Sequence, residues 1–64
     1  MITHDQVHKR FAKYGFACCP LSYRRISYCI NAGFSLDQTY SVGCDVYAGF
    51  SFLESFDAAW EASS

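Results

Sequence analysis

The tetrapeptide Ala-Gly-Phe-Ser occurs at residues 32–35 and again at residues 48–51, and the third residue after its Ser is Gln38 or Glu54. Gly readily adopts the left-handed backbone conformation that closes a helix. Ser caps a following helix by accepting hydrogen bonds from its first free N–H groups, and Gln or Glu at the third helical position reaches back to the cap. Phe stands between them, where an apolar side chain can pack against the turn. The repeat therefore predicts a helix end followed at once by a helix start, twice in the second half of the chain.

The first half follows the same logic. Thr3 and Gln6 form a capping box, and Gly15 is the expected helix end, so we expect a helix over residues 4–14. A second helix begins either with Pro20 as its first residue or after a Ser22 cap, and it ends at Gly33. The apolar residues that we expect to face inward are Val7, Phe11 and Tyr14 in the first helix and Ile26, Cys29 and Ile30 in the second.

Residues 36–48 fit two patterns. As a helix, the segment places one set of side chains inward (Leu36, Tyr40, Gly43, Cys44 and Tyr47) and another outward (Asp37, Gln38, Ser41 and Asp45). As a strand, Tyr40 and alternate residues up to Phe52 would share one face, and the composition suits a sheet. We favour the helix because the cap signals at both of its ends agree with its period. The alternative is an α+β fold with a hairpin over residues 40–52.

A last helix is expected over residues 52–62. Its predicted buried side consists of Phe52, Leu53, Phe56, Ala59 and Trp60, and Glu54, Asp57 and Glu61 line the opposite side. At 64 residues the chain is expected to form a single domain, 1–64. The predicted fold is all-α, a compact bundle of about four short helices with an aromatic core.

Four cysteines occur without a secretion signal at the N-terminus, and no apolar run is long enough to span a membrane. We therefore expect a cytoplasmic protein in which Cys18, Cys19, Cys29 and Cys44 stay reduced and act as small apolar side chains. His4 and His8 have the spacing of two metal ligands on one helical face, but no C-x-x-C pair accompanies them.

No residue pattern supports catalysis. A Cys–His pair could be drawn from Cys18 or Cys19 with His8, but nothing in the sequence orients a base or builds an oxyanion site. No phosphate-binding Gly-rich loop is present, because each Gly ends or interrupts a helix. We expect no enzyme, no metal site and no cofactor.

Charge is segregated along the chain. The five cations, Lys9, Arg10, Lys13, Arg24 and Arg25, precede Gly33 with only Asp5 among them. The five remaining acids, Asp37, Asp45, Glu54, Asp57 and Glu61, follow Gly33 with no Lys or Arg between them. Such segregation concerns partners and association rather than fold.

Residues 25–45 resemble the helix-turn-helix pattern of DNA-binding proteins, with Ala-Gly-Phe-Ser at the turn. Two departures weaken the implied function. The second helix would present Asp37 and Asp45 to phosphate groups, and Thr39 stands where that family packs an apolar residue. Nucleic acid could instead contact the five cations, so a small nucleic-acid-binding regulator is the alternative function.

The acidic residues form the more distinctive surface. They would either keep the protein soluble or dock, as a mimic of DNA, on a basic nucleic-acid-binding groove of another protein. Tyr23, Tyr28 and Tyr47 could anchor such a partner, although we expect them at the core or its boundary. Association between the two oppositely charged halves would give a weak homo-oligomer in place of a monomer.

As a whole, the chain resembles the small orphan proteins that phages encode to disarm host machinery, among them the anti-CRISPR inhibitors. The resemblance rests on size, an aromatic core with free thiols, short capped helices and segregated charge, and it transfers no residue role. It implies a stoichiometric inhibitor, working in the host cytoplasm, that covers the DNA-binding or assembly surface of a CRISPR effector complex.

Overall fold

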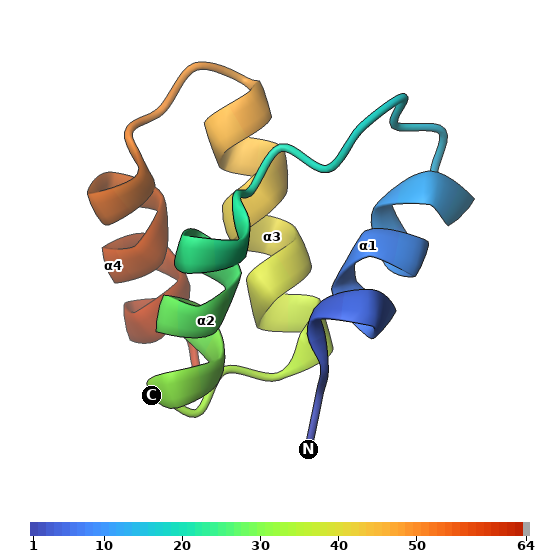
Figure 1. Cartoon of the computed structure of the whole chain (residues 1–64). Coiled ribbons are helices and arrows are strands. Elements are labelled where there is room, and N and C mark those ends of the chain that lie inside the picture. The colour runs from blue at the N-terminus through green and yellow to red at the C-terminus, as the bar shows by residue number, and fades with distance from the viewer. Residues whose placement is uncertain (64) are drawn as a thin grey trace.

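The computed structural model describes residues 1–63 and contains four helices: α1 (His4–Lys13), α2 (Tyr23–Asn31), α3 (Leu36–Tyr47) and α4 (Phe52–Ala62) (Figure 1). No strand occurs in this range, so the all-α prediction is confirmed and the hairpin alternative over residues 40–52 is wrong. Within residues 1–63 no helix is both long and apolar enough to cross a membrane.

Each helix begins at a hydroxyl side chain. Thr3, Ser22, Ser35 and Ser51 are the N-caps, and each accepts a hydrogen bond from the backbone N–H three residues further on. Ser22, not Pro20, therefore starts the second helix. Reciprocal capping boxes close at α1 and α3, where the side-chain oxygens of Gln6 and Gln38 accept from the cap N–H groups at 2.8 Å. All four helix starts are thus stabilised by local hydrogen bonds.

Three helices end in the same way, at a Gly followed by a Phe. At the end of α2, the Gly33 N–H donates to Ile30 O at 3.0 Å and the Phe34 N–H donates to Cys29 O at 3.0 Å. This is a Schellman motif, and it requires the positive φ of 88° at Gly33. The same pair of bonds closes α1 before Phe16 and α3 before Phe50. The Ala-Gly-Phe-Ser repeat is therefore a helix end joined directly to a cap.

Helix α3 lies at the centre and packs against the other three helices (Figure 1). The buried apolar core consists of Val7, Phe11, Leu21, Ile26, Cys29, Phe34 and Val42. At Gly43 the α3 backbone meets the Phe11 ring of α1 so closely that an added Cβ would lie 2.9 Å from ring atom Cε1. The missing side chain at Gly43 is therefore what lets α1 approach α3.

The predicted inward face of α3 is partly wrong. Val42 and Thr39 are buried, whereas Tyr47 is exposed. The Thr39 hydroxyl donates to Ser35 O at 2.9 Å, so its burial leaves no polar group unpaired. Because α3 has neighbours on three sides, its buried surface is wider than the single apolar stripe expected of a helix that faces the core on one side only.

The predicted buried side of α4 is wrong at two positions. Leu53 and Trp60 are more than half exposed, and Ser55 is buried in their place, with its hydroxyl donating to Ser51 O at 2.9 Å. Phe52, Phe56 and Ala59 are partly buried against the core, as expected. Helix α4 therefore turns small residues toward α3 and leaves part of its apolar side facing solvent.

Candidate functional site

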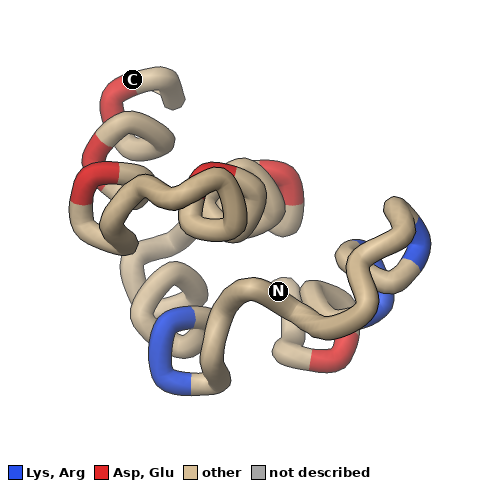
Figure 2. Tube along the Cα trace, turned by 90° about the horizontal axis from the view of Figure 1, so that it is seen from above, with Lys and Arg blue, Asp and Glu red and all other residues tan. Residues whose placement is uncertain are grey.

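The segregation of charge along the sequence is also a segregation in space. Seen from above, the acidic segments lie on α3 and α4 at one side, and the basic segments lie on α1 and at the start of α2 on the other (Figure 2). Asp5, on α1, is the one acid within the basic layer. The acidic residues that the sequence singled out are thus carried by two adjacent, tightly packed helices.

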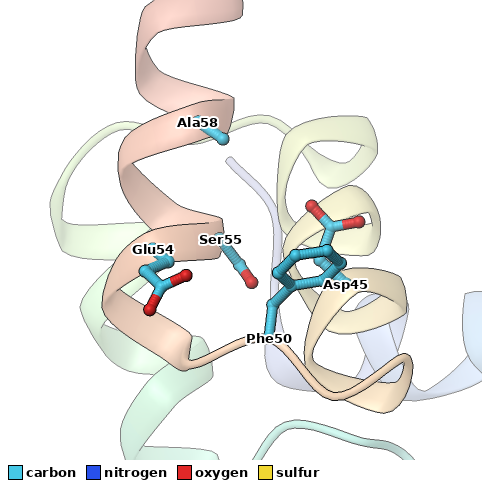
Figure 3. A pocket seen from close by; sticks show the side chains of 5 residues that line it. All are labelled: Asp45, Phe50, Glu54, Ser55 and Ala58. Atoms are coloured by element: carbon cyan, nitrogen blue, oxygen red, sulfur yellow. The ribbon is translucent and has the colours of Figure 1, made fainter.

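Two of these carboxylates share a cleft. Asp45, near the end of α3, and Glu54, in the first turn of α4, line a shallow cleft of about 330 Å³ together with Phe50, Ser55 and Ala58 (Figure 3). Phe50 belongs to the loop between the helices, and its side chain is 58% exposed. The cleft therefore combines two acidic groups with an accessible aromatic ring.

The conformation of Glu54 corrects a sequence prediction. We expected its carboxylate to return to the Ser51 backbone and complete a capping box. Ser51 does accept from the Glu54 N–H at 3.2 Å, but the Glu54 side chain lines the cleft instead (Figure 3). The local cap survives with one hydrogen bond, and the carboxylate is left available to the surface.

The other acids are placed differently. Asp37, at the start of α3, pairs with Arg10 of α1 at 2.6 Å and borders a separate, smaller cleft with Gln38 and Ser41. Asp57 and Glu61 are exposed on α4. The structure thus brings Asp45 and Glu54 together, puts Asp57 and Glu61 on the same helix as Glu54, and engages Asp37 with a cation.

Most of the basic side chains contact carboxylates or aromatic rings of the same chain. Lys9 pairs with Asp5 at 3.0 Å on the surface of α1. The Arg10 guanidinium lies 5.5 Å and 5.4 Å from the ring centroids of Tyr14 and Tyr40, so it contacts both rings and also pairs with Asp37.

The remaining three cations are exposed, as Lys9 is. The Lys13 ammonium lies 5.8 Å from the Tyr14 ring centroid, and the Arg25 guanidinium lies 5.3 Å from the Phe52 ring centroid. Arg24 is exposed on the first turn of α2. The five cations are therefore divided between α1 and the start of α2 (Figure 2), and they do not form one continuous strip along a single helix.

All four cysteines are free thiols, but they do not share one environment. Cys29 is buried, and burial raises the pKa of its thiol to about 11. Burial also raises the pKa of Cys19, against a hydrogen bond with the Leu21 backbone that lowers it. Cys18 is exposed, so the expectation of a buried apolar role is wrong for this residue. Raised pKa values describe protonated thiols, not activated nucleophiles.

The histidines pack against one ring. His4 and His8 lie 5.2 Å and 4.9 Å from the Tyr23 ring centroid, and His4 Nε2 forms a 2.7 Å hydrogen bond with the Ser27 hydroxyl. Within residues 1–63 there is no group of three or more side chains able to hold a metal ion. The two histidines thus join the N-terminal halves of α1 and α2.

Sequence reasoning missed Phe50 as part of the surface. The three Gly-Phe turns are chemically alike, and the Phe that follows each Gly was expected to pack. Phe16 and Phe34 do so, at 5.1 Å from Phe11 and 4.5 Å from Phe56 between ring centroids. Phe50 remains exposed, in the loop that joins α3 to α4 (Figure 3). No local signal distinguishes the third turn from the other two.

Comparisons of the chain with protein-family models, with curated proteins and with solved structures give no significant match.

Proposed function

We propose that the protein is a small protein-binding inhibitor that docks its acidic α3–α4 surface on a basic surface of a partner. The observation that carries the proposal is the cleft in which Asp45 and Glu54, from consecutive helices, flank the exposed ring of Phe50. A Lys or Arg side chain suits such a cleft, because its charged head pairs with carboxylates and its apolar stem or guanidinium packs on an aromatic ring.

The charge distribution supports the same choice of partner. Helices α3 and α4 carry five acids and no cation, so their outer surface attracts basic surfaces and repels nucleic acid. Charge complementarity of this kind accelerates encounter and selects the partner more than it adds affinity. A basic groove that normally holds DNA or RNA is a target with that property.

The resemblance to small phage-encoded inhibitors makes this proposal more specific. The partner would be a CRISPR effector complex in the cytoplasm of a bacterial host, and the acidic surface would occupy its DNA-binding or subunit-assembly surface. Such an inhibitor acts by stoichiometric binding and needs no catalytic group or cofactor.

The test uses purified CRISPR effector complexes of several types, with binding of target DNA as the readout. We expect added protein to compete with DNA for at least one complex, and the competition to weaken as salt is raised. The double variant Asp45→Lys, Glu54→Lys should lose about tenfold or more of this activity. Asp5→Lys is the control, because it reverses the charge of an exposed acid on α1, which is the change that each of the two cleft replacements makes.

Two results would reject the proposal. One is target-DNA binding that is unaffected by the protein in every complex. The other is an Asp5→Lys variant that loses as much competition as the cleft variant. A gel shift of free DNA or RNA by the protein alone, abolished by the double variant Arg24→Glu, Arg25→Glu, would favour the nucleic-acid-binding alternative instead.

A further inference from the structure

Two neighbouring cysteines, Cys18 and Cys19, lie in the loop that joins α1 to α2, and the proposed function uses neither of them. We call this segment, residues 14–22, the α1–α2 loop (Figure 1). Cys18 is exposed and lines a cleft of about 380 Å³, which is separate from the acidic cleft and is bordered by the rings of Tyr14 and Tyr47. A small molecule can therefore reach the Cys18 thiol from solvent.

Cys19 has a different environment. It is half-buried and packs against the core, and its sulfur accepts a hydrogen bond from the N–H of Leu21, a residue that is almost fully buried. Burial raises the pKa of the Cys19 thiol, and the hydrogen bond from Leu21 opposes that rise. Cys19 therefore helps to hold the α1–α2 loop on the core, whereas Cys18 offers its sulfur to solvent.

The α1–α2 loop can change its conformation without breaking backbone hydrogen bonds. In the part of the chain that the structure describes, residues 17–21 form no hydrogen bond between backbone groups. The other two thiols lie within helices, Cys29 in α2 and Cys44 in α3. A covalent bond between Cys18 and Cys19 would thus unwind no helical turn, and its main cost in the fold is the contact of Cys19 with the core and with Leu21.

We propose that Cys18 and Cys19 form a reversible dithiol–disulfide pair, which a low-molecular-weight disulfide such as glutathione disulfide closes, and that closure releases the α1–α2 loop from the core. The proposal concerns a surface remote from Asp45 and Glu54 in the sequence, and it does not depend on the proposed function.

The reaction consists of two thiol–disulfide exchanges. Cys18 reacts first because it is exposed: its thiolate attacks one sulfur of glutathione disulfide, a mixed disulfide forms on Cys18, and the first glutathione leaves as a thiolate that takes up a proton. The Cys19 thiolate then attacks the Cys18 sulfur and displaces the second glutathione in the same way. The dithiol thus loses two electrons and two protons, and one glutathione disulfide becomes two glutathione thiols.

The closed pair is easily reduced again. The Cα atoms of neighbouring residues lie about 3.8 Å apart across a trans peptide bond, whereas disulfides usually span about 4.4–6.8 Å between Cα atoms. A disulfide between Cys18 and Cys19 is therefore strained, and strained disulfides are the readily reduced ones. We expect the pair to stay reduced in a reducing compartment and to close only when the oxidant is in excess.

The experiment treats the full reduced chain with excess glutathione disulfide at about pH 8, where an exposed thiol is partly ionised. Acid and alkylation stop the exchange before digestion. Trypsin then separates the cysteines, because residues 14–24 contain Cys18 and Cys19 and residues 26–64 contain the other two. We expect mass spectrometry to find the loss of two hydrogen atoms in residues 14–24, and dithiothreitol should reverse it.

Variants separate the two steps. Cys19→Ser should stop at the mixed disulfide and keep one glutathione on Cys18, since no neighbouring thiol displaces it. Cys18→Ser should react about tenfold more slowly or less, because the remaining thiol of the pair is half-buried. Cys44→Ser is the matched control, because it removes a half-buried thiol from α3 and should leave closure unchanged.

Two further controls keep the result interpretable. The acidic-cleft variant Asp45→Lys, Glu54→Lys should close the pair as the wild-type chain does, so failure of one proposal is distinguishable from failure of the other. Far-UV circular dichroism confirms that each variant is folded.

Closure also has a structural signature. When the Cys19 sulfur bonds to Cys18, the Leu21 N–H loses its acceptor. Hydrogen exchange of the Leu21 amide, followed by NMR, should therefore be about tenfold faster or more in the oxidised chain, and reduction should restore the slow exchange.

Three outcomes would overturn the inference. The first is no loss of hydrogen within residues 14–24 at any excess of oxidant, including a disulfide that forms instead to residues 26–64 or to a second copy. The second is a wild-type chain that keeps one glutathione per molecule, as Cys19→Ser does. The third is an oxidised chain in which the Leu21 amide exchanges no faster than in the reduced chain.

Discussion

The close approach of α1 and α3 at Gly43 gives a prediction opposite in sign to the usual rule for helices. In an open helix interior, replacing Gly by Ala stabilises by about 1 kcal/mol, because Ala has the better helix propensity. At Gly43, however, a new Cβ would lie 2.9 Å from Cε1 and 3.0 Å from Cε2 of the Phe11 ring, and closer still to its Cζ. Real methyl groups do not approach ring carbons that closely, so the structure has to shift.

The Phe11 ring has little room to yield. It is fully buried, and it lies 5.1 Å and 4.8 Å from the centroids of Phe16 and Tyr40. Overpacking of a full core costs about 1–3 kcal/mol and occasionally more. After subtracting the propensity gain of about 1 kcal/mol, we expect Gly43→Ala to lower the free energy of unfolding by up to about 2 kcal/mol. In a domain of this size, each kcal/mol lowers Tm by about 4–8 °C.

The assay is urea unfolding followed by far-UV circular dichroism, with thermal melts as a second measure. Phe11→Leu is the matched background, because it shortens the ring that causes the clash while keeping the core apolar. In that background Gly43→Ala should become neutral or stabilising, and the double-mutant cycle should show a favourable coupling. If Gly43→Ala in the chain that keeps Phe11 raises the free energy of unfolding by about 1 kcal/mol, the reasoning is refuted.

Ser51→Ala should lower the free energy of unfolding by about 1 kcal/mol, because Ser51 caps α4, and a change below the error of urea unfolding would contradict that role. Thr39→Val should change it by less than about 1 kcal/mol, since Ser35 O still accepts from the Thr39 N–H, and a larger loss in the same measurement would show that the hydroxyl matters. Stability should fall between pH 9 and about pH 11, because the Cys29 thiol ionises near 9 once unfolded but only near 11 when folded. Urea unfolding at several pH values in this range should show that the free energy of unfolding falls less in Cys29→Ala than in the wild-type chain. An equal fall in both would exclude Cys29 as its cause. In mass-spectrometric alkylation, Cys18 should react before Cys29, and the reverse order would contradict their exposures.

The ends of the helices were predictable because their signals are local. A Gly at positive φ and a Ser cap act within a few residues, so Gly33 and Ser35 could be read without knowing what the helices pack against. The number of helices and the all-α class follow from the same signals. The choice at residues 40–52 was correct because two caps outweighed a β-prone composition.

The faces of the helices were less predictable because they depend on packing partners far away in sequence. Thr39 is buried because α3 has neighbours on three sides, and Trp60 stays half exposed on α4, a helix that packs mainly against α3. The role of Gly43 depends on the ring of Phe11 on another helix. Of the candidate site, the acidic character of α3 and α4 was predictable, but the meeting of Asp45, Glu54 and Phe50 in one cleft was not.

The three Gly-Phe turns also bear on how quickly the chain reaches its native state. Each turn closes through hydrogen bonds that span no more than six residues, so it can form before distant segments meet. Folds dominated by contacts between residues near in sequence fold within microseconds to milliseconds. Little loop entropy has to be lost before their first favourable contacts form. A newly made copy of this protein would therefore be ready to act almost as soon as its synthesis ends.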